Sequence, residues 1–504
     1  MKAVIIGAGI GGLYCGAKLA RAGNRVLILE KNPHVGGTSY IFKRGEYFFP
    51  MGPLAFSFPS KVKSLIKEAG VQAEIKFTRN DFQLLTSVMN LVYSQPLRQL
   101  REELERMFPQ ESAGIKAFTA EMQRIISLTN DIVDWHPSFL LGRKRDLALR
   151  DIDPSLEERL KAVEKYSDAK SAEFIDSHIG NQHLRNLLGS QGTFAPELSM
   201  LNLAFMWNVM SEEGIWSPSC GIHGLSDMLK DVFLASGGEI RSDSPVKRIL
   251  VEKGVAVGVV TENDEVFRAD WVVSNADQKK TFLELLNPED VPPEHLDLIK
   301  AVPYTDSELC VYLGVDPKKV NLDKMRADHL FFRKEMDLDK PYDPEDFDNK
   351  EIEICLWTRN NPDSAPQGGV CLILRVDFPH EYFAHWRTGE KRRREGYKAC
   401  KEKLAWKLIE TVETVLPGLA SSIEVMETAT PLTYQDWGNR FLGSIAGWTW
   451  SAELARRLPG KLLIETPISH LLMVGIYAAS ELYMGGVPTS MHTSKSAADL
   501  MLER

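Results

Sequence analysis

Short apolar runs rich in β-branched residues stand at both ends of the first thirty residues. Residues 3–6 read Ala-Val-Ile-Ile, residues 25–29 read Arg-Val-Leu-Ile-Leu, and a stretch rich in small residues separates them. Continuous apolar runs of this length are typical of strands that are buried on both faces of a parallel sheet. The pattern predicts a strand, a turn, a helix and a second strand, as at the start of an α/β domain.

The predicted turn and helix carry three glycines at a characteristic spacing. Gly7, Gly9 and Gly12 follow the first strand, and Glu30 ends the second strand eighteen residues after Gly12. The first glycine of such a set allows a tight turn, the second lets the backbone approach a pyrophosphate, and the third lets the helix pack closely. An acid at the end of the second strand binds ribose hydroxyls. A glycine-rich turn that binds nothing would leave Glu30 unexplained, so we expect a Rossmann-like dinucleotide site.

Residues after Glu30 favour FAD over the nicotinamide cofactors. The negative charge of Glu30 disfavours the 2′-phosphate of NADP. A second glycine pair, Gly36-Gly37, follows within seven residues, and a further small-residue turn lies at Gly52-Pro53. A large flavin nucleotide needs a second loop of this kind near its pyrophosphate and ribityl chain, whereas NAD dehydrogenases usually do not.

Later segments predict a second kind of domain. Apolar spacing typical of helices occurs at 97–108, 155–179 and 397–419, and strand-like runs occur at 308–315, 351–358 and 369–376. Strands and amphipathic helices in this mixture predict a mixed sheet backed by helices. The expected fold class is therefore α/β, with a Rossmann-like domain and a discontinuous α+β substrate domain.

Composition excludes several classes of function. The formal net charge is −9, so general nucleic-acid binding is not expected. The six cysteines show neither CxxC nor zinc-type spacing, so we expect no metal site, no paired redox cysteines and a reducing, cytoplasmic setting. No uncharged apolar stretch reaches the ~18 residues of a spanning helix. Basic runs near Arg143 and Arg392 are either solvated faces or contacts with an anionic membrane surface.

Several longer segments resemble one known family. The segments are 211–259, 269–286 with its Ser274-Asn275-Ala276 sequence, 364–369, 417–433 and 441–448. Together with the glycine fingerprint, they resemble the FAD-dependent phytoene desaturases, carotenoid isomerases and retinol saturases, within the wider flavin amine oxidase-like superfamily. The resemblance extends over nearly the whole chain.

The resemblance implies how the chain divides into domains. The C-terminal segment of such proteins returns to the nucleotide domain. The FAD-binding domain is therefore expected at 1–75, 216–295 and 455–504, and the substrate domain at 76–215 and 296–454.

The resemblance also implies a flavin-facing helix near the C-terminus. Gly485, Gly486, Val487 and Pro488 match a turn whose following helix points its N-terminus at the flavin ring. Free N–H groups and the helix dipole there stabilise negative charge. The family usually has Gly-Asp where this chain has Gly475-Ile476, and the family's Asp binds the ribityl chain. With isoleucine at this position and a longer spacer before the turn, we expect the local flavin contacts to differ from those of the family.

The candidate site residues follow from the fingerprint and the resemblance together. The expected FAD contacts are Gly7, Gly9, Gly11, Gly12, Glu30, Lys31, Gly37, Thr38, Gly52, Pro53, Val246, Asn275, Gly475, Ile476, Gly486, Val487 and Pro488. His492 lies one turn into the C-terminal helix and is a candidate acid or base, with a packing histidine as the alternative. Trp207, Trp216, Trp437, Trp448 and Trp450 are candidates for the wall of an apolar tunnel, with core packing as the equal alternative.

The expected function is FAD-dependent oxidation, reduction or isomerisation at C–C or C=C bonds of a long apolar substrate. The resemblance implies a polyene isoprenoid such as a carotenoid, with a quinone, oxygen or a carrier protein as electron partner and peripheral membrane contact as an option. Two alternatives stay open: a flavin amine oxidase, and a non-catalytic prenyl-lipid carrier like the Rab GDP-dissociation inhibitors.

Overall fold

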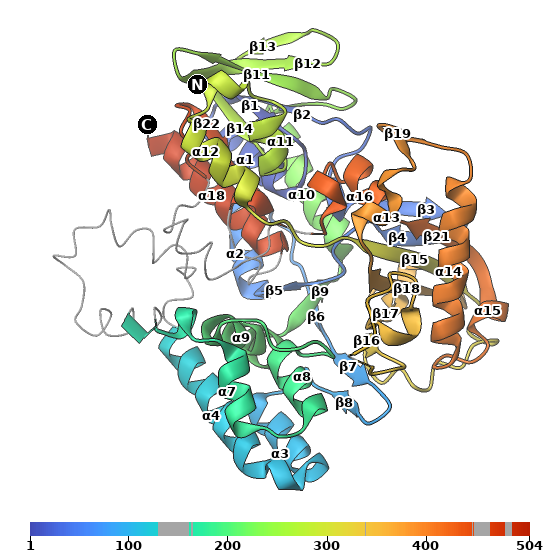
Figure 1. Ribbon diagram of the computed structural model, residues 1–504. Helices are drawn as coiled ribbons and strands as arrows, with labels where there is room; N and C mark the ends of the chain where they lie inside the picture. The colour runs from blue at the N-terminus through green and yellow to red at the C-terminus, as the bar shows by residue number, and fades with distance from the viewer. Residues whose placement is uncertain are drawn as a thin grey trace.

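The structure is a computed structural model of the whole chain (Figure 1). It describes residues 1–129, 161–162, 165–337, 339–445, 447, 464–478 and 486–503. Within these ranges, no helix is long and apolar enough to cross a membrane.

A five-stranded parallel sheet forms the centre of the first domain. Its strands, in spatial order, are β10 (Glu239–Arg241), β2 (Arg25–Leu29), β1 (Lys2–Ile6), β14 (Trp271–Ser274) and β22 (Leu471–Met473). β1 and β2 are buried apart from their first residues, as their apolar sequences predict. Three distant parts of the chain therefore share one sheet.

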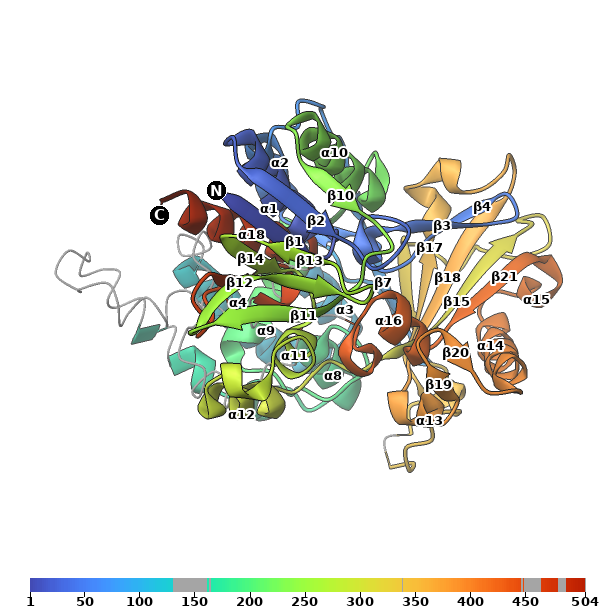
Figure 2. The ribbon, with the colours of Figure 1, turned by 90° about the horizontal axis from the view of Figure 1, so that it is seen from above.

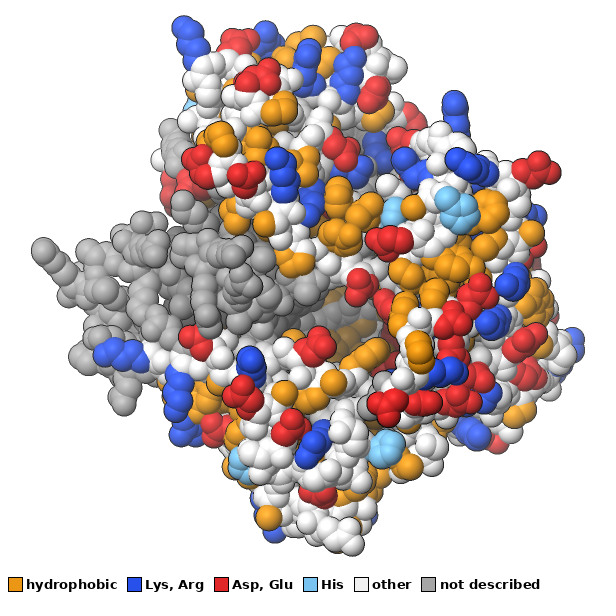
Figure 3. Space-filling model, in the orientation of Figure 1, with side chains coloured by type: hydrophobic (Ala, Val, Ile, Leu, Met, Phe, Trp, Pro, Cys, Tyr) orange, Lys and Arg blue, Asp and Glu red, His pale blue; other side chains and the backbone are white. Residues whose placement is uncertain are grey.

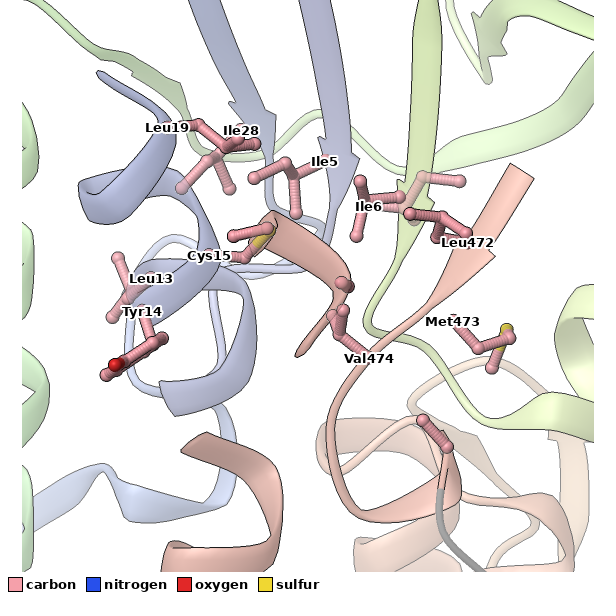
Figure 4. Packing of buried hydrophobic residues seen from close by; sticks show 14 of the residues in the cluster. Ile5, Ile6, Leu13, Tyr14, Cys15, Leu19, Ile28, Leu472, Met473 and Val474 are labelled. Carbon is pink, nitrogen blue, oxygen red and sulfur yellow. The ribbon is translucent and has the colours of Figure 1, made fainter. Parts of the chain in front are cut away.

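Helices cover one face of this sheet, and a small antiparallel sheet covers the other (Figures 1 and 2). The helices are α1 (Ile10–Arg21), α2 (Pro59–Ala69), α10 (Gly221–Ala235) and α18 (Gly486–Glu503). The small sheet consists of β11 (Val246–Glu252), β12 (Val255–Thr261) and β13 (Val266–Arg268). Figure 4 shows side chains such as Ile5, Ile28 and Cys15 packing between the strands and α1.

A seven-stranded mixed sheet forms the centre of the second domain. Its spatial order is β21 (Ile423–Ala429), β15 (Glu308–Val315), β18 (Val370–Asp377), β17 (Ile352–Leu356), β16 (His329–Phe332), β7 (Phe82–Leu85) and β8 (Asn90–Val92). Neighbours are antiparallel except β16 and β7, which are parallel. The long helix α14 (Tyr397–Glu413) contributes to the core on one face. The expected mixed sheet backed by helices is confirmed.

The two faces of this second sheet pack against different parts of the molecule. Alternate residues of β15, such as Leu309, Val311 and Leu313, belong to the apolar core that includes α14. The intervening residues, such as Cys310 and Tyr312, face the other way. They pack with the hairpin of β3 (Ile41–Arg44) and β4 (Tyr47–Pro50). This hairpin comes from the predicted nucleotide domain, so the two domains interlock here; the predicted domain boundaries stay predictions.

A helical lobe with its own core extends from the second sheet (Figure 1). Its helices are α3 (Leu97–Met107), α4 (Ser112–Thr129), α7 (Ser171–His178), α8 (Gln182–Ser190) and α9 (Met200–Trp207). The helix expected over 155–179 is not continuous in its described part. α7 begins only at Ser171, because Lys170 is extended and bridges to Ser199.

Shorter elements connect these parts. They are β5 (Phe56–Ser57), β6 (Phe77–Asn80), β9 (Ile215–Pro218), α11 (Gln278–Leu283), α12 (Pro293–Ala301), α13 (His380–Ala384), β19 (Arg387–Gly389), β20 (Arg392–Arg393), α15 (Leu419–Ser422) and α16 (Pro431–Trp437).

Candidate functional site

A cleft of about 470 Å³ lies at the carboxyl edge of the parallel sheet. Residues after β1, β2, β14 and β22 form one side, and residues of β15, β18 and α16 form another. Ligands of open α/β sheets bind outside the carboxyl ends of the strands. Figure 3 shows hydrophobic side chains bordering a hollow at the centre of one face of the molecule, with charges of both signs interspersed around it.

The fingerprint glycines are required by close approaches of the chain. Gly7 has a φ of +93°, which favours glycine. A Cβ at residue 12 would overlap the Gly7 carbonyl oxygen. Glycine at these two positions therefore allows α1 to begin directly above the end of β1.

The side chain of Asn275 fills the space between three other glycines. A Cβ at residue 9 would lie 2.9 Å from Asn275 Nδ2, and one at residue 11 would lie 2.6 Å from Asn275 Oδ1. A Cβ at Gly475 would overlap the same oxygen. The Asn275 Nδ2 donates to the Gly7 carbonyl at 3.4 Å. This asparagine therefore joins three distant loops at the floor of the cleft.

Two helices begin at the cleft. The N-cap of α1 is Gly9, whose lack of a side-chain cap leaves the first N–H groups of the helix available to an anion. α18 begins at Gly486, and its first-turn residues Gly486 and Val487 line the cleft. Pro488 is the third residue of α18 and lies in its first turn, where its missing N–H costs no helical bond. Gly485 lies outside the described residues.

Glu30 is buried at the end of β2 and lines the cleft. Its Oε2 accepts the Ala8 N–H at 2.8 Å and its Oε1 accepts the Asn32 N–H at 2.9 Å. Burial raises the pKa of Glu30, although these hydrogen bonds and the nearby Lys31 oppose the shift. Glu30 thus orders the loops on both sides of itself.

Lys31 connects the parallel sheet with the second domain. Its Nζ donates to the Asp436 carbonyl at 2.7 Å and to Glu390 Oε1 at 3.0 Å. Burial lowers the pKa of Lys31, and Glu390 partly offsets this. The Lys31 contacts bring the segments around Glu390 and Asp436 to one end of the cleft.

The second glycine loop is held against the turn at Gly52. A Cβ at residue 52 would lie 2.8 Å from the Thr38 Cβ, so glycine permits this contact. Thr38 Oγ1 accepts a hydrogen bond from Arg440 Nη2 at 3.2 Å. Arg375 Nη2 donates to the Gly52 carbonyl. Two arginines of the second domain therefore fix this loop.

The structure brings most of the predicted site residues together. Those that line the cleft are Gly7, Gly9, Gly11, Glu30, Lys31, Gly37, Thr38, Gly52, Pro53, Val246, Asn275, Ile476, Gly486 and Val487. Gly12, Gly475 and Pro488 do not line it, although Gly12 and Gly475 pack against the lining residues Gly7 and Asn275. His492 is half-buried on α18 away from the cleft lining, and its predicted catalytic role gains no support from this position.

The candidate tryptophans have different environments. Trp207 is fully buried in the helical lobe, where its Nε1 donates to the Leu188 carbonyl at 2.8 Å. Core packing therefore describes Trp207, and a tunnel role does not. Trp216 lies on β9 away from the described cleft, whereas Trp437 lines it. Trp448 and Trp450 lie outside the described residues.

Sequence reasoning missed three polar residues of the cleft wall. Glu308 is at the start of β15, Arg375 is on β18, and Tyr434 is on α16. The Tyr434 hydroxyl donates to Glu308 Oε1. The signal available in the sequence was a charged residue within an otherwise apolar strand, as in the run Leu-Ile-Leu-Arg-Val of β18.

Burial and neighbouring charges determine the pKa values of Arg375 and Tyr434. Burial opposes the charge of Arg375, but Glu308 and Glu353 outweigh it and raise the pKa of Arg375. Burial and the Glu308 carboxylate raise the pKa of Tyr434. At neutral pH the guanidinium is therefore charged and the phenol is neutral.

The chain is similar over most of its length to two known enzymes. The chain is 27% identical over 495 residues to the chloroplastic prolycopene isomerase of Arabidopsis thaliana, covering 95% of this chain and 78% of that protein. It is 25% identical over 513 residues to the all-trans-retinol 13,14-reductase of Danio rerio, covering 94% and 82%. The resemblance inferred from sequence motifs is confirmed.

A solved structure supports the fold. A putrescine oxidase with bound putrescine superposes with a TM-score of 0.63 at 14% identity, with all of both chains covered. The family model for flavin containing amine oxidoreductases matches residues 10–502. The chain belongs to the flavin containing amine oxidoreductase family.

Proposed function

We propose that this protein is an FAD-dependent oxidoreductase acting on C–C or C=C bonds of a long apolar isoprenoid of the carotenoid or retinoid kind. The observation that carries the proposal is the glycine-lined cleft at the carboxyl edge of the parallel sheet. Near-full-length similarity to a prolycopene isomerase and a retinol 13,14-reductase supports the substrate class. The proposal includes desaturation, saturation and isomerisation, with a quinone, oxygen or a carrier protein as electron partner.

The residues of the cleft fit FAD. The N–H groups at the start of α1 and the loop at Gly37 would hold the pyrophosphate, because that helix end is uncapped and its glycines leave the backbone accessible. Glu30 would accept the ribose hydroxyls through its remaining lone pairs while it keeps its bonds to the Ala8 and Asn32 amides. The N-terminal turn of α18 would face the flavin ring. When bound, FAD supplies hydride transfer.

The protein's own side chains would exclude water and orient the ligand. Ile476, Tyr477 and Ile445 give part of the cleft an apolar wall, which suits an apolar chain. Glu308, Arg375 and Tyr434 supply the polar groups at the second sheet.

The family also includes amine oxidases, so amine oxidation is the enzymatic alternative. A protonated amine entering the cleft would meet the charged guanidinium of Arg375, whose pKa is raised despite its burial, because Glu308 and Glu353 stabilise the charge. Glu308 and Glu353 balance this charge, so the preference for an isoprenoid over an amine rests on the similarity to the prolycopene isomerase and the retinol 13,14-reductase.

A two-part experiment tests the proposal. The purified protein should show flavin absorbance bands at about 370 and 450 nm. It should then convert all-trans-retinol or prolycopene, under oxidising or reducing conditions, to products separated by chromatography and identified by mass spectrometry. Absence of flavin would favour a prenyl-lipid carrier, and turnover of putrescine alone would favour amine oxidation.

A further inference from the structure

We propose that Arg375 binds an oxygen atom of the substrate, so that the preferred ligand is an apolar chain ending in a hydroxyl, carbonyl or carboxylate rather than a pure hydrocarbon. The inference rests on the proposed function and narrows its substrate class.

Strand register places Arg375 beside Glu353 on the cleft-facing side of the second sheet. In the neighbouring strands, Arg375 is paired with Cys310 of β15 and with Glu353 of β17. Residues paired in this way point to the same face of a sheet. Arg375 lines the cleft, and 15% of its side chain is exposed. The guanidinium is therefore enclosed but within reach of a ligand.

The hydrogen-bonding capacity of Arg375 is largely unused. A guanidinium carries five N–H donors. Among the described residues, its single hydrogen bond runs from Nη2 to the Gly52 carbonyl, and Nε has no partner. Glu308 Oε1 lies 3.7 Å from Nε and Glu353 Oε2 lies 3.8 Å from Nη1, both beyond hydrogen-bond distance. Such unused capacity is uncommon for a buried polar group.

The two neighbouring carboxylates are already engaged by other residues. Glu308 accepts the Tyr434 hydroxyl, and Glu353 contacts His329 Nδ1 at 2.7 Å. They therefore balance the charge of Arg375 without satisfying its donors. Burial opposes ionisation of Glu353, but His329 and Arg375 lower its pKa, so this carboxylate remains charged. This arrangement holds the charged Arg375 guanidinium in place and leaves some of its N–H donors available to an acceptor.

An oxygen atom of the ligand would complete this arrangement, whereas a hydrocarbon would not. Hydrogen bonds from charged groups to oxygen are among the stronger ones in proteins. A hydrocarbon end placed against the guanidinium would cut it off from water without replacing the lost bonds. We expect a preference of about tenfold or more for the oxygen-bearing ligand.

A matched pair of ligands tests the inference on the holoprotein. The probes are all-trans-retinol and axerophthene, the hydrocarbon with the same carbon skeleton and no hydroxyl. Dissociation constants are measured by quenching of tryptophan fluorescence, which requires no turnover. The wild type should bind retinol about tenfold more tightly. Arg375→Met should weaken retinol binding to the level of axerophthene and leave axerophthene binding unchanged.

The control variant is Arg359→Met. Arg359 also lies in the second domain, where it donates to the Met325 carbonyl at 3.1 Å, and it does not line the cleft. This variant should keep the wild-type preference for retinol. Circular dichroism and flavin content verify the fold of each variant.

Removal of Arg375 alone leaves two buried carboxylates without their cation. If Arg375→Met does not fold, Arg375→Met combined with Glu308→Gln removes one opposite charge and retains the pair of Glu353 and His329. Equal wild-type binding of both probes, or a retained preference in a folded variant lacking Arg375, would overturn the inference. Wild-type protein that binds neither probe would instead contradict the proposed substrate class.

Discussion

At the residue scale, the contact between Gly9 and Asn275 gives the sharpest test of the nucleotide site. Gly9→Leu should reduce FAD affinity by at least about tenfold, because its side chain would displace Asn275 and occupy the expected pyrophosphate position. Fluorescence titration of the apoprotein with FAD measures the change. Gly180→Leu is the control, since Gly180 is exposed in the helical lobe and its Cβ would contact only the Glu111 carboxylate, at 3.1 Å. Full FAD occupancy in folded Gly9→Leu would contradict the assignment.

Ile476 allows a second residue-scale prediction. It lines the cleft beside the start of α18, at the position where the family resemblance implies an acid. Ile476→Asp should tighten FAD binding by about 10- to 150-fold, because hydrogen bonds involving a charged group are worth ~1.5–3 kcal/mol.

The matched control for this prediction is Ile476→Leu, which should change FAD affinity little. Glu481→Ala tests whether the longer spacer supplies a substitute acid; Glu481 lies outside the described residues. A large loss of affinity in Glu481→Ala, with no gain in Ile476→Asp, would show that the acid has moved along the chain.

At the element scale, one buried carboxylate holds the β19–β20 hairpin against α16. Asp436 accepts hydrogen bonds from Arg387 Nη2 at 3.0 Å and from the Lys391 N–H at 2.8 Å, and Arg393 Nη2 lies 2.7 Å from its Oδ2. Asp436→Asn should lower the free energy of unfolding by about 3 kcal/mol at pH 7, because it leaves two arginines without their anion. Urea denaturation measures the loss without screening the ion pairs, with exposed Asp363→Asn as the control.

The difference in free energy of unfolding between the wild type and Asp436→Asn should depend on pH through the pKa of Asp436. Burial opposes its ionisation, but Arg393, the Lys391 amide and Arg387 lower the pKa in the folded state. The stabilisation is therefore complete above the unfolded-state pKa of about 3.9 and is lost as the pH falls through the lower folded-state value. The gap between wild type and Asp436→Asn should close in acid. A gap that stays constant to low pH would exclude the charge as its cause.

At the scale of the whole molecule, FAD should link the two domains, because both contribute to the cleft. Hydrogen exchange should slow on FAD addition at 36–38, 245–247 and 438–440, which lie along the cleft. It should change little in α3 and α4 of the helical lobe, which serve as the internal control. The melting temperature should rise with FAD concentration, by an amount equivalent to about 2.7 kcal/mol at 100 times Kd. Protection confined to the first domain would contradict a shared site.

The basic run around Arg392 is a candidate for contact with an anionic membrane surface. Most of its residues are exposed, but Arg393 turns inward to Asp436. The run near Arg143 lies outside the described residues. Peripheral membrane contact and a cytoplasmic location stay predictions.

The amino-acid sequence by itself determined the first βαβ unit and its glycine loop. The reason is that Gly7, Gly12 and Glu30 act over short distances along the chain, where a tight turn and an uncapped helix start depend on local backbone geometry. Apolar runs likewise predicted β15, β17 and β18 of the second sheet, because strands that are buried in a sheet require them, but they did not predict β21, β16, β7 or β8.

Only the tertiary structure decided which distant side chains meet. The cluster of Glu308, Arg375 and Tyr434 depends on the register of β15 against β18 and on the position of α16, neither of which follows from local pattern. The same holds for Asn275, which contacts glycines from both ends of the chain. Each pairing is fixed by the packing of several elements at once, so the polar wall of the cleft appears only when the sheets are assembled.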